Sequence, residues 1–139
     1  MALYTKPLST NTRSWADLDL DFIAHPVTKD VVLKRNVEAI KRSVRNLVLT
    51  NPHERPFHPE IGSGIRGILF DLVSPTTAVV LQSAIREVLT NYEPRAILQD
   101  ISVLGDVDKN GYYVTIKFQP ISTPAPVVVE LFLERLRIL

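Results

Sequence analysis

The chain contains no cysteine and only one methionine and one tryptophan in 139 residues. Without cysteine it has no disulfide, no thiolate metal ligand and no cysteine nucleophile, which fits a reducing compartment. Long hydrophobic runs are also missing: no stretch approaches the ~18 apolar residues of a membrane span, and residues 1–6 lack the apolar core of a signal peptide. We therefore expect a soluble protein that is intracellular where it is made.

Neither sign of charge dominates the sequence. Sixteen lysines and arginines are matched by fifteen aspartates and glutamates, so the formal net charge is +1. This balance does not indicate a nucleic-acid-binding surface or an acidic substrate. The length and the 45% content of hydrophobic residues are those of one globular domain with its own core. We expect a polar N-terminal arm over residues 1–16 and a single domain over residues 17–139.

Two segments have the periodicity of helices. In residues 36–50 the apolar side chains recur at helical spacing, and Asn36 is the expected N-cap. Ser74 and Pro75 match the N-cap and first-turn preferences of a second helix, which a downstream proline ends near Tyr92. The expected buried faces are Val37, Ile40, Val44, Leu47 and Val48 in the first helix and Ala78, Leu81, Ile85, Val88, Leu89 and Tyr92 in the second.

The last third of the chain predicts an antiparallel sheet. Residues 97–104 are an expected strand, turn residues follow at 108–111, and residues 112–119 alternate in polarity, so we expect a hairpin. Residues 127–133 are apolar on both faces apart from Glu130, which predicts a strand covered on both sides. Helices and strands do not alternate as βαβ units. The expected fold class is therefore α+β, a single domain whose small mixed or antiparallel sheet carries a C-terminal hairpin plus strand packed against two main helices.

Acidic and apolar residues alternate at the start of the expected domain. The series is Asp17, Leu18, Asp19, Leu20, Asp21 and Phe22. A period of two predicts a strand with a buried apolar face and a wet acidic face. Three aspartates at this spacing also suit a cation, but no further oxygen ligands or glycine turn follow them. A solvated acidic face that protects an edge strand is therefore favoured.

The polar side of the first helix is mostly basic. It carries Lys34, Glu38, Lys41, Arg42 and Arg45. Such a stripe is usually a solvated face. The alternatives are docking on an acidic partner and contact with DNA, and the latter predicts a steep dependence of binding on salt.

A stiff loop connects the two helices. Residues 49–63 contain three prolines and are expected to hold Glu54, Arg55 and Phe57 in fixed positions. Rigidity without regular structure suits a binding surface, because less conformational entropy is lost when a partner binds.

The tripeptide Glu93-Pro94-Arg95 follows the second helix and forms a stiff corner. Proline locks its own φ and keeps the preceding residue extended, so both charged side chains are expected on one side of the corner. We expect them to be held apart and available to a partner. The alternative is a local surface ion pair without a functional role.

The order and spacing of these motifs resemble those of a known family. The resemblance spans about residues 17–135 and points to the contractile-tail baseplate wedge family, which includes wedge subunits of phages with contractile sheaths and of type VI secretion systems. One departure is His53, where the family usually has glycine. The matching segments are Asp19-Leu20-Asp21-Phe22, Ala39-Ile40, Leu47-Val48-Leu49-Thr50, Glu54-Arg55-Pro56-Phe57 with Pro59 and Gly62, Leu69-Phe70-Asp71, and Glu93-Pro94-Arg95.

The resemblance implies a structural baseplate protein of a contractile injection machine, in first place a phage tail, and not an enzyme. It implies other baseplate wedge proteins and the tail sheath protein as partners, with six copies in each baseplate. The implied location is the virion, after synthesis in the cytoplasm of the bacterial host. No cofactor, metal, small-molecule substrate, membrane or nucleic acid is expected to take part.

The resemblance also implies where partners bind. In the family the Glu-Pro-Arg corner contacts the wedge core, and sheath assembly starts when sheath subunits add extended arms to a sheet edge. Taken without the resemblance, the C-terminal strand is instead expected in the centre of the core. The implied residues are Glu93, Pro94 and Arg95 for the wedge core, Glu54, Arg55 and Phe57 for a second contact in the loop, and Val127, Val129, Leu131 and Leu133 for the sheath.

The rival function is a lysozyme-like enzyme of the tail that degrades peptidoglycan. That chemistry needs two carboxylates about 5–9.5 Å apart across a cleft, one of them with a raised pKa. The candidate acids are Glu54, Glu60, Asp71 and Glu93, and nothing in their spacing places two of them in one groove.

Other site chemistries are not indicated. The histidines, His25, His53 and His58, all lie beside prolines in expected loops, so no helix brings two of them together as a zinc site requires. The short glycine motif at residues 62–64 lacks the lysine of a phosphate-binding loop.

Overall fold

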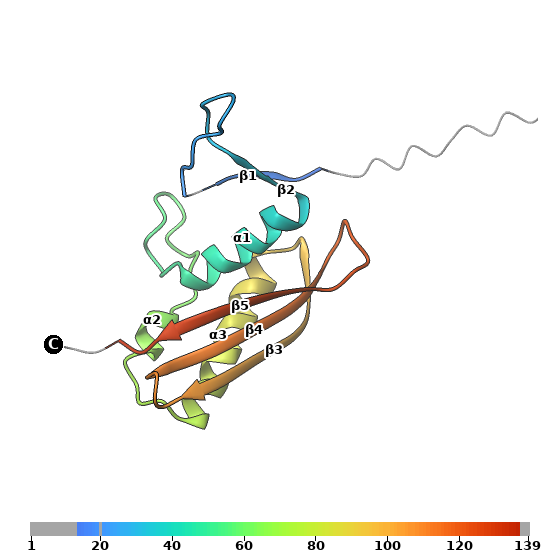
Figure 1. The fold of residues 1–139 in the computed structure, drawn as a ribbon. Coiled ribbons are helices and arrows are strands. Elements are labelled where there is room, and N and C mark those ends of the chain that lie inside the picture. The colour runs from blue at the N-terminus through green and yellow to red at the C-terminus, as the bar shows by residue number, and fades with distance from the viewer. Residues whose placement is uncertain (1–13, 20, 137–139) are drawn as a thin grey trace, which may run out of the picture.

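The computed structural model describes residues 14–19 and 21–136. Its elements follow in the order β1, β2, α1, α2, α3, β3, β4 and β5, so the helices lie together in the middle of the chain (Figure 1). The fold is α+β with antiparallel sheets, as the sequence predicts. Within the described residues, none of the helices has both the length and the apolar character needed to cross a membrane.

A three-stranded antiparallel sheet forms the C-terminal part of the domain. Its strands are β3 (Ala96–Asp106), β4 (Gly111–Pro120) and β5 (Val127–Glu134), in the spatial order β3-β4-β5. The predicted hairpin of β3 and β4 is confirmed, with the turn at residues 107–110. The inward side chains of β4 are fully buried and form the centre of the core: Tyr112, Val114, Ile116 and Phe118.

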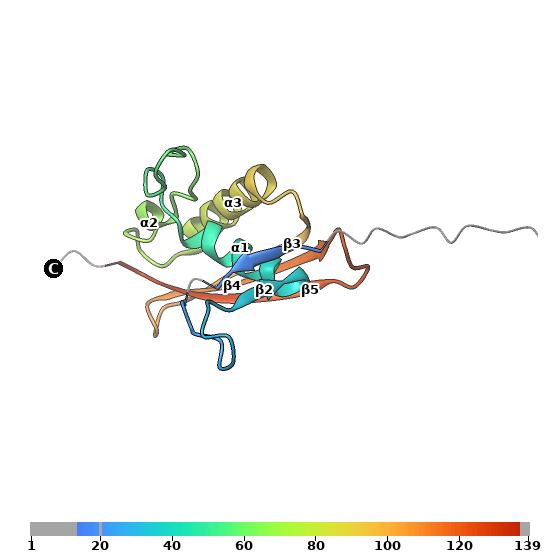
Figure 2. The same cartoon turned by 90° about the horizontal axis from the view of Figure 1, so that it is seen from above.

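Helix α3 (Pro75–Tyr92) covers one face of this sheet (Figure 2). Ser74 is its N-cap, because the Ser74 side chain accepts a hydrogen bond from Thr77 N–H at 3.1 Å. The predicted bounds of this helix are confirmed. Its predicted stripe faces the core, with Leu81, Ile85, Val88 and Leu89 buried and Ala78 and Tyr92 half-buried.

Helices α1 (Asn36–Leu49) and α2 (Ile65–Ile68) complete the helical part of the fold. The predicted apolar side of α1 is buried, apart from the half-buried Val37. The predicted N-cap is wrong, since Asn36 lies within the bounds of α1 with a φ of 49° and Arg35 takes the capping position without a side-chain bond. Asn36 instead holds the N-terminal segment: its Oδ1 accepts a hydrogen bond from Trp15 N–H, and its own N–H donates to Trp15 O at 2.8 Å.

Strands β1 (Ala16–Leu18) and β2 (Leu33–Arg35) form a separate two-stranded sheet next to α1. Residues 1–13 of the predicted arm lie outside the described residues. The prediction for the acidic series holds for the exposed Asp21 but is wrong for Asp19 and for the apolar positions. Asp19 is 2% exposed, whereas Leu18 and Phe22 are 56% and 68% exposed, and Leu20 lies outside the described residues.

Ion pairs explain the buried aspartate. Asp19 lies 3.2 Å from Lys34 Nζ and 3.8 Å from Arg42 Nη2, and Asp21 lies 2.5 Å from the same arginine. A carboxylate is stable away from water when opposite charges and hydrogen bonds compensate for its lost hydration. Lys34 and Arg42 of the basic stripe therefore neutralise aspartates of the same chain. They are not simply solvated, and they are not free to bind a partner.

Strand β5 also differs from its prediction. It is an edge strand, and only one set of its alternating side chains is buried. Val128, Glu130 and Phe132 are exposed on the opposite face, whereas α2 and α3 lie on the buried side of the sheet (Figure 2). The predicted cover on both faces is therefore wrong for the part of the chain that the structure describes.

Candidate partner-binding sites

The corner after α3 brings Glu93 and Arg95 into direct contact. Glu93 is the C-cap of α3 and leaves the helical conformation, with a φ of −126°, just before Pro94. Arg95 Nε and Nη2 donate to the two carboxylate oxygens of Glu93 at 2.6 and 2.9 Å. The side chains do lie on one side of the corner, as predicted. The expectation that they are held apart is wrong, since they form a bidentate ion pair.

This ion pair connects three parts of the fold. The Ser43 hydroxyl of α1 donates a hydrogen bond to Glu93, and Arg95 lies 3.3 Å from Asp17 of β1. The Arg95 guanidinium also lies over the ring of Trp15, 5.4 Å from the ring centre. These contacts hold the end of α3 against α1 and against the N-terminal hairpin, formed by β1 and β2. The ion pair is therefore not just a local pair on the surface.

Both members of the pair are held in their charged forms. Burial by itself raises the pKa of Glu93, but hydrogen bonds from Arg95 and Ser43 and the charge of Arg95 outweigh it, so the pKa lies below its ordinary value. The hydrogen bond to Glu93 is the main cause that raises the pKa of Arg95. Glu93 is 2% exposed and the Arg95 side chain 18%. A partner therefore reaches the exposed Pro94 and the rim of the pair, not its centre.

The loop between α1 and α2 is closed on itself. His53 N–H donates to Pro59 O at 2.8 Å, which joins the two sides of the loop. The Glu54 carboxylate accepts hydrogen bonds from the backbone and side-chain nitrogens of Asn51 at 2.8 and 2.7 Å, and these bonds lower the pKa of Glu54. The loop therefore has a defined shape without regular secondary structure.

Two non-glycine residues of this loop have a positive φ. His53 and Phe57 both have a φ of 69°, in the left-handed region that glycine enters without strain. Phe57 is also 97% exposed, so it takes no part in the core. An exposed aromatic side chain on a strained backbone is a candidate anchor for a partner. Arg55 is exposed as well, whereas the carboxylate of Glu54 is used inside the loop.

The outer edge of β5 lies beside α1 and is open in the sense that its backbone groups are unpaired among the described residues. Arg135 N–H donates to Asn110 O on the β4 side, and Leu136 N–H donates to Leu69 O on the other side. Because successive residues of a strand direct their backbone groups to opposite edges, the even-numbered residues of β5 point away from β4. Within the described chain, these residues make no backbone bond to another element at that edge: Val128, Glu130, Phe132 and Glu134.

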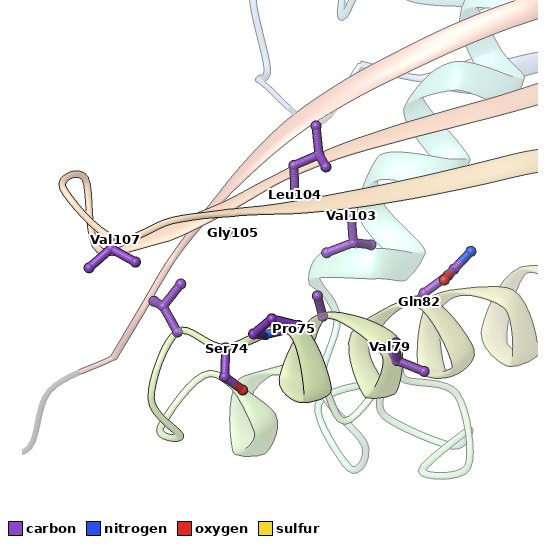
Figure 3. Close-up of a pocket in the computed structure, with 10 residues that line it drawn as sticks. Ser74, Pro75, Val79, Gln82, Val103, Leu104, Gly105 and Val107 are labelled. Atoms are coloured by element: carbon purple, nitrogen blue, oxygen red, sulfur yellow. The ribbon is translucent and has the colours of Figure 1, made fainter.

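The other edge of the sheet is interrupted in two places. The side-chain amide of Gln82 on α3 donates to the Ile101 carbonyl of β3 at 2.6 Å, and β3 has an irregularity between Leu98 and Asp100. Figure 3 shows α3 beside β3, with Gln82 on the helix next to a hollow of about 410 Å³. A capped carbonyl and a bulge both hinder the pairing of an edge with another chain. The two edges of this sheet therefore differ.

The side chains predicted for the sheath contact lie inside the domain. Val129, Leu131 and Leu133 are at most 9% exposed, and Val127 is half-buried. The residues accessible at this edge are instead the even-numbered ones. One feature of the sequence indicates which face of β5 is exposed. Glu130 interrupts the apolar run, and it lies on the exposed face.

Three of the four acids considered for peptidoglycan cleavage form hydrogen bonds with neighbouring side chains of the same chain. These three have a pKa below the ordinary value, whereas the general acid of a glycosidase needs a raised one. The fourth, Asp71, is exposed. Among the described residues no cluster of histidine and acidic side chains has the arrangement to hold a metal ion. The hydrogen-bonded pairs are Glu54 with Asn51, Glu60 with His58, and Glu93 with Arg95.

Comparison with known proteins agrees with the motifs. The model of the family described as baseplate wedge protein gp25 matches residues 34–125, which include the closed loop and the corner and end before β5. The chain belongs to this family. The baseplate wedge protein gp25 of Enterobacteria phage T4 is 32% identical to this chain over 96 residues. These residues are 69% of this chain and 73% of the phage protein. The predicted family is confirmed, and the chain is a structural component of a contractile-tail baseplate.

Two solved structures are similar to the wedge protein. A putative tail lysozyme from Geobacter sulfurreducens has a TM-score of 0.64 at 25% identity, covering 74% of this chain and 96% of that one. A chain of the cryo-EM structure of the anti-feeding prophage baseplate, solved with six-fold symmetry, has a TM-score of 0.62 at 22% identity and covers 90% and 88% of the two chains. The second likeness shows the fold alone.

Proposed function

We propose that the wedge protein initiates sheath assembly by receiving an extended arm of a sheath subunit at the outer edge of β5. The difference between the two edges of its sheet carries this proposal. The β5 edge presents unpaired backbone groups, whereas β3 is capped by Gln82 and carries a bulge. Strand addition satisfies such groups, and each new hydrogen bond contributes roughly 0.5–1.5 kcal/mol net.

The side chains next to the edge suit the same role. Val128 and Phe132 are 47% and 43% exposed and lie on the outer face of the sheet, on either side of Glu130. An added strand covers part of this apolar surface with alternate side chains. Backbone bonds then supply affinity, and these contacts supply specificity.

Replacing Glu130 with proline tests this role without breaking the sheet. The Glu130 N–H points to the open edge, so proline removes a group that an added strand needs and leaves the ladder with β4 intact. We expect sheath binding to fall about tenfold or more, through one lost hydrogen bond and the obstruction by the ring. Co-purification with the sheath protein of the same particle measures the effect.

Glu130→Thr is the matched control, because threonine removes the charge and keeps the N–H. The threonine variant is expected to bind the sheath protein like the parent chain. Both variants are compared by thermal unfolding. A proline variant that folds normally and still recruits the sheath protein at parental strength would rule out strand addition at β5.

We further infer that the closed loop and the corner contact other baseplate wedge proteins. Phe57 supports this because it is fully exposed on a strained backbone, and the corner supports it because Pro94 projects from a rigid, ion-paired support. Rigid surfaces lose little entropy on binding. Buried aromatic anchors supply a large share of the binding free energy of interfaces.

Phe57→Ala is expected to weaken association with the wedge core by about tenfold or more, the usual range for a central aromatic anchor. The free energy of unfolding is expected to change by less than about 0.5 kcal/mol, because the side chain contacts no core. Titration of the purified chain with the other wedge proteins measures the association. Val27→Ala, at a side chain 82% exposed in another loop, is the control and is expected to have no effect on either quantity.

The proposal has three further parts. They are six copies in each baseplate, synthesis in the host cytoplasm and a role without catalysis. The six-fold symmetry of the similar anti-feeding prophage baseplate supports the copy number. The lowered pKa values of Glu54, Glu60 and Glu93 support a structural role over an acid-catalysed one.

A further inference from the structure

A basic groove runs beside the open edge of β5. It has a volume of about 260 Å³ and lies between α1 and β5. Four cationic side chains and one carboxylate line it, so its charge is positive, and Val128 and Val129 form its floor. The polar lining is Lys34, Glu38, Lys41, Arg42 and Arg45.

Only some of these cations are neutralised by the chain itself. Lys34 and Arg42 face the aspartates of the N-terminal hairpin, as described above. Lys41 pairs with Glu38 at 2.9 Å, but both side chains are partly or largely exposed, so the pair is readily exchanged. Arg45 is exposed and makes no ion pair with the described residues. Lys41 and Arg45 are therefore the charges that the groove offers to a ligand.

The spacing of these two residues matches an extended chain. Four residues along a helix advance by about 6 Å. Alternate residues of a strand are about 6.8 Å apart and lie on the same face. Because α1 runs alongside β5 (Figure 1), side chains at alternate positions of a strand paired with β5 come within reach of Lys41 and Arg45 in turn.

We propose that the segment that adds to β5 is acidic, with carboxylates at two alternate positions on the face toward α1. This inference rests on the proposed strand addition and adds the chemistry of the incoming arm. Charge complementarity selects such a segment from other extended peptides. It also disfavours the N-terminal residues of this chain, because residues 1–13 contain Lys6 and Arg13 and no acidic residue. A nucleic acid has the right charge but lacks the peptide groups that pair with a strand edge.

Three synthetic nine-residue peptides test the proposal. They share a β-forming sequence and differ at two alternate positions, which are both glutamate, both glutamine or both lysine. Binding is followed at low salt by the amide NMR signals of Val128, Glu130, Phe132 and Glu134 in the labelled full chain. We expect the glutamate peptide to bind about tenfold more tightly than the glutamine peptide, and the lysine peptide to bind least.

Charge reversal provides the matched test on the protein. Lys41→Glu with Arg45→Glu is expected to invert the order, so that the lysine peptide binds most tightly. The control, Arg66→Glu with Arg86→Glu, makes the same change in net charge at exposed helical positions outside the groove and is expected to keep the original order. Thermal unfolding confirms that both double variants are folded.

The outcomes separate this inference from the proposed function. Equal binding of the glutamate and glutamine peptides overturns the acidic preference and leaves strand addition standing. No change in the β5 amide signals with any peptide overturns strand addition and this inference together. A single-stranded oligonucleotide that binds the groove more tightly than the glutamate peptide also overturns the inference, because the groove then serves a nucleic acid.

Discussion

Replacing Glu93 with glutamine is expected to lower the free energy of unfolding by about 3 kcal/mol at pH 7. The carboxylate is buried and accepts hydrogen bonds from both Arg95 and Ser43. Glutamine has nearly the same shape, so the loss arises from a guanidinium that remains in place without its main counter-charge. Asp17 keeps part of the compensation, which holds the effect near the lower end for a broken buried pair. Urea unfolding of the parent and variant chains measures the difference.

The same substitution is expected to change the response to acid. The pKa of Glu93 is lower in the folded chain than its ordinary value of 4.5. The carboxylate therefore favours folding at every pH above that ordinary value, and this contribution is lost as the pH falls through the folded pKa. Glutamine does not titrate, so the gap in stability between the parent and Glu93→Gln is expected to narrow below about pH 4.5.

Glu87→Gln is the control for both measurements. Glu87 is exposed on the same helix, and its replacement is expected to change stability by less than about 0.5 kcal/mol. A loss in Glu93→Gln no larger than that in Glu87→Gln, with a parallel dependence on pH, would contradict the structural role of the corner.

Gly62→Ala is expected to destabilise the chain by roughly 2–3 kcal/mol through overpacking. A Cβ at this position would lie 2.8 Å from the Asn51 carbonyl oxygen and closer still to the Asn51 carbonyl carbon and Pro52 nitrogen. These are backbone atoms, so no side-chain rotation relieves the contact. The two ends of the closed loop must move apart, and this displaces Phe57. We therefore expect weaker association with the wedge core in addition to a lower unfolding midpoint.

Gly67→Ala is the control, and its expected effect on stability has the opposite sign. Gly67 lies in α2, and a Cβ there meets no atom within 4 Å. Alanine favours the helical conformation, so this variant is expected to be unchanged or up to about 1 kcal/mol more stable. Equal stability of the two alanine variants would show that the close approach at Gly62 has no energetic consequence.

Local signals in the sequence predicted the elements that depend on neighbouring residues. Ser74, Pro75 and Pro94 set the ends of α3, because capping and proline geometry act within a few residues. The hairpin of β3 and β4 was predicted from its turn and its alternation for the same reason. The corner was also predicted as a rigid feature with both charges on one side, since proline restricts its neighbour whatever the tertiary context.

The features that sequence reasoning missed depend on residues far apart in the chain. Asp19 is buried because Lys34 and Arg42 reach it from β2 and α1, and alternation of polarity cannot reveal those partners. Asp17 likewise meets Arg95 only in the folded chain. The apolar pattern by itself predicted β5 in the centre of the core, because an apolar run indicates burial but not the number of neighbouring strands; the resemblance alone implied a sheet edge there.

The bond from Gln82 to Ile101 has a consequence for how a larger structure is built. The bonded carbonyl and the bulge make β3 the less favourable edge for a further strand, so growth of the sheet is expected at β5. Pairing of copies of this chain through the β3 edge is therefore disfavoured. One side chain thus biases the direction in which the sheet can grow.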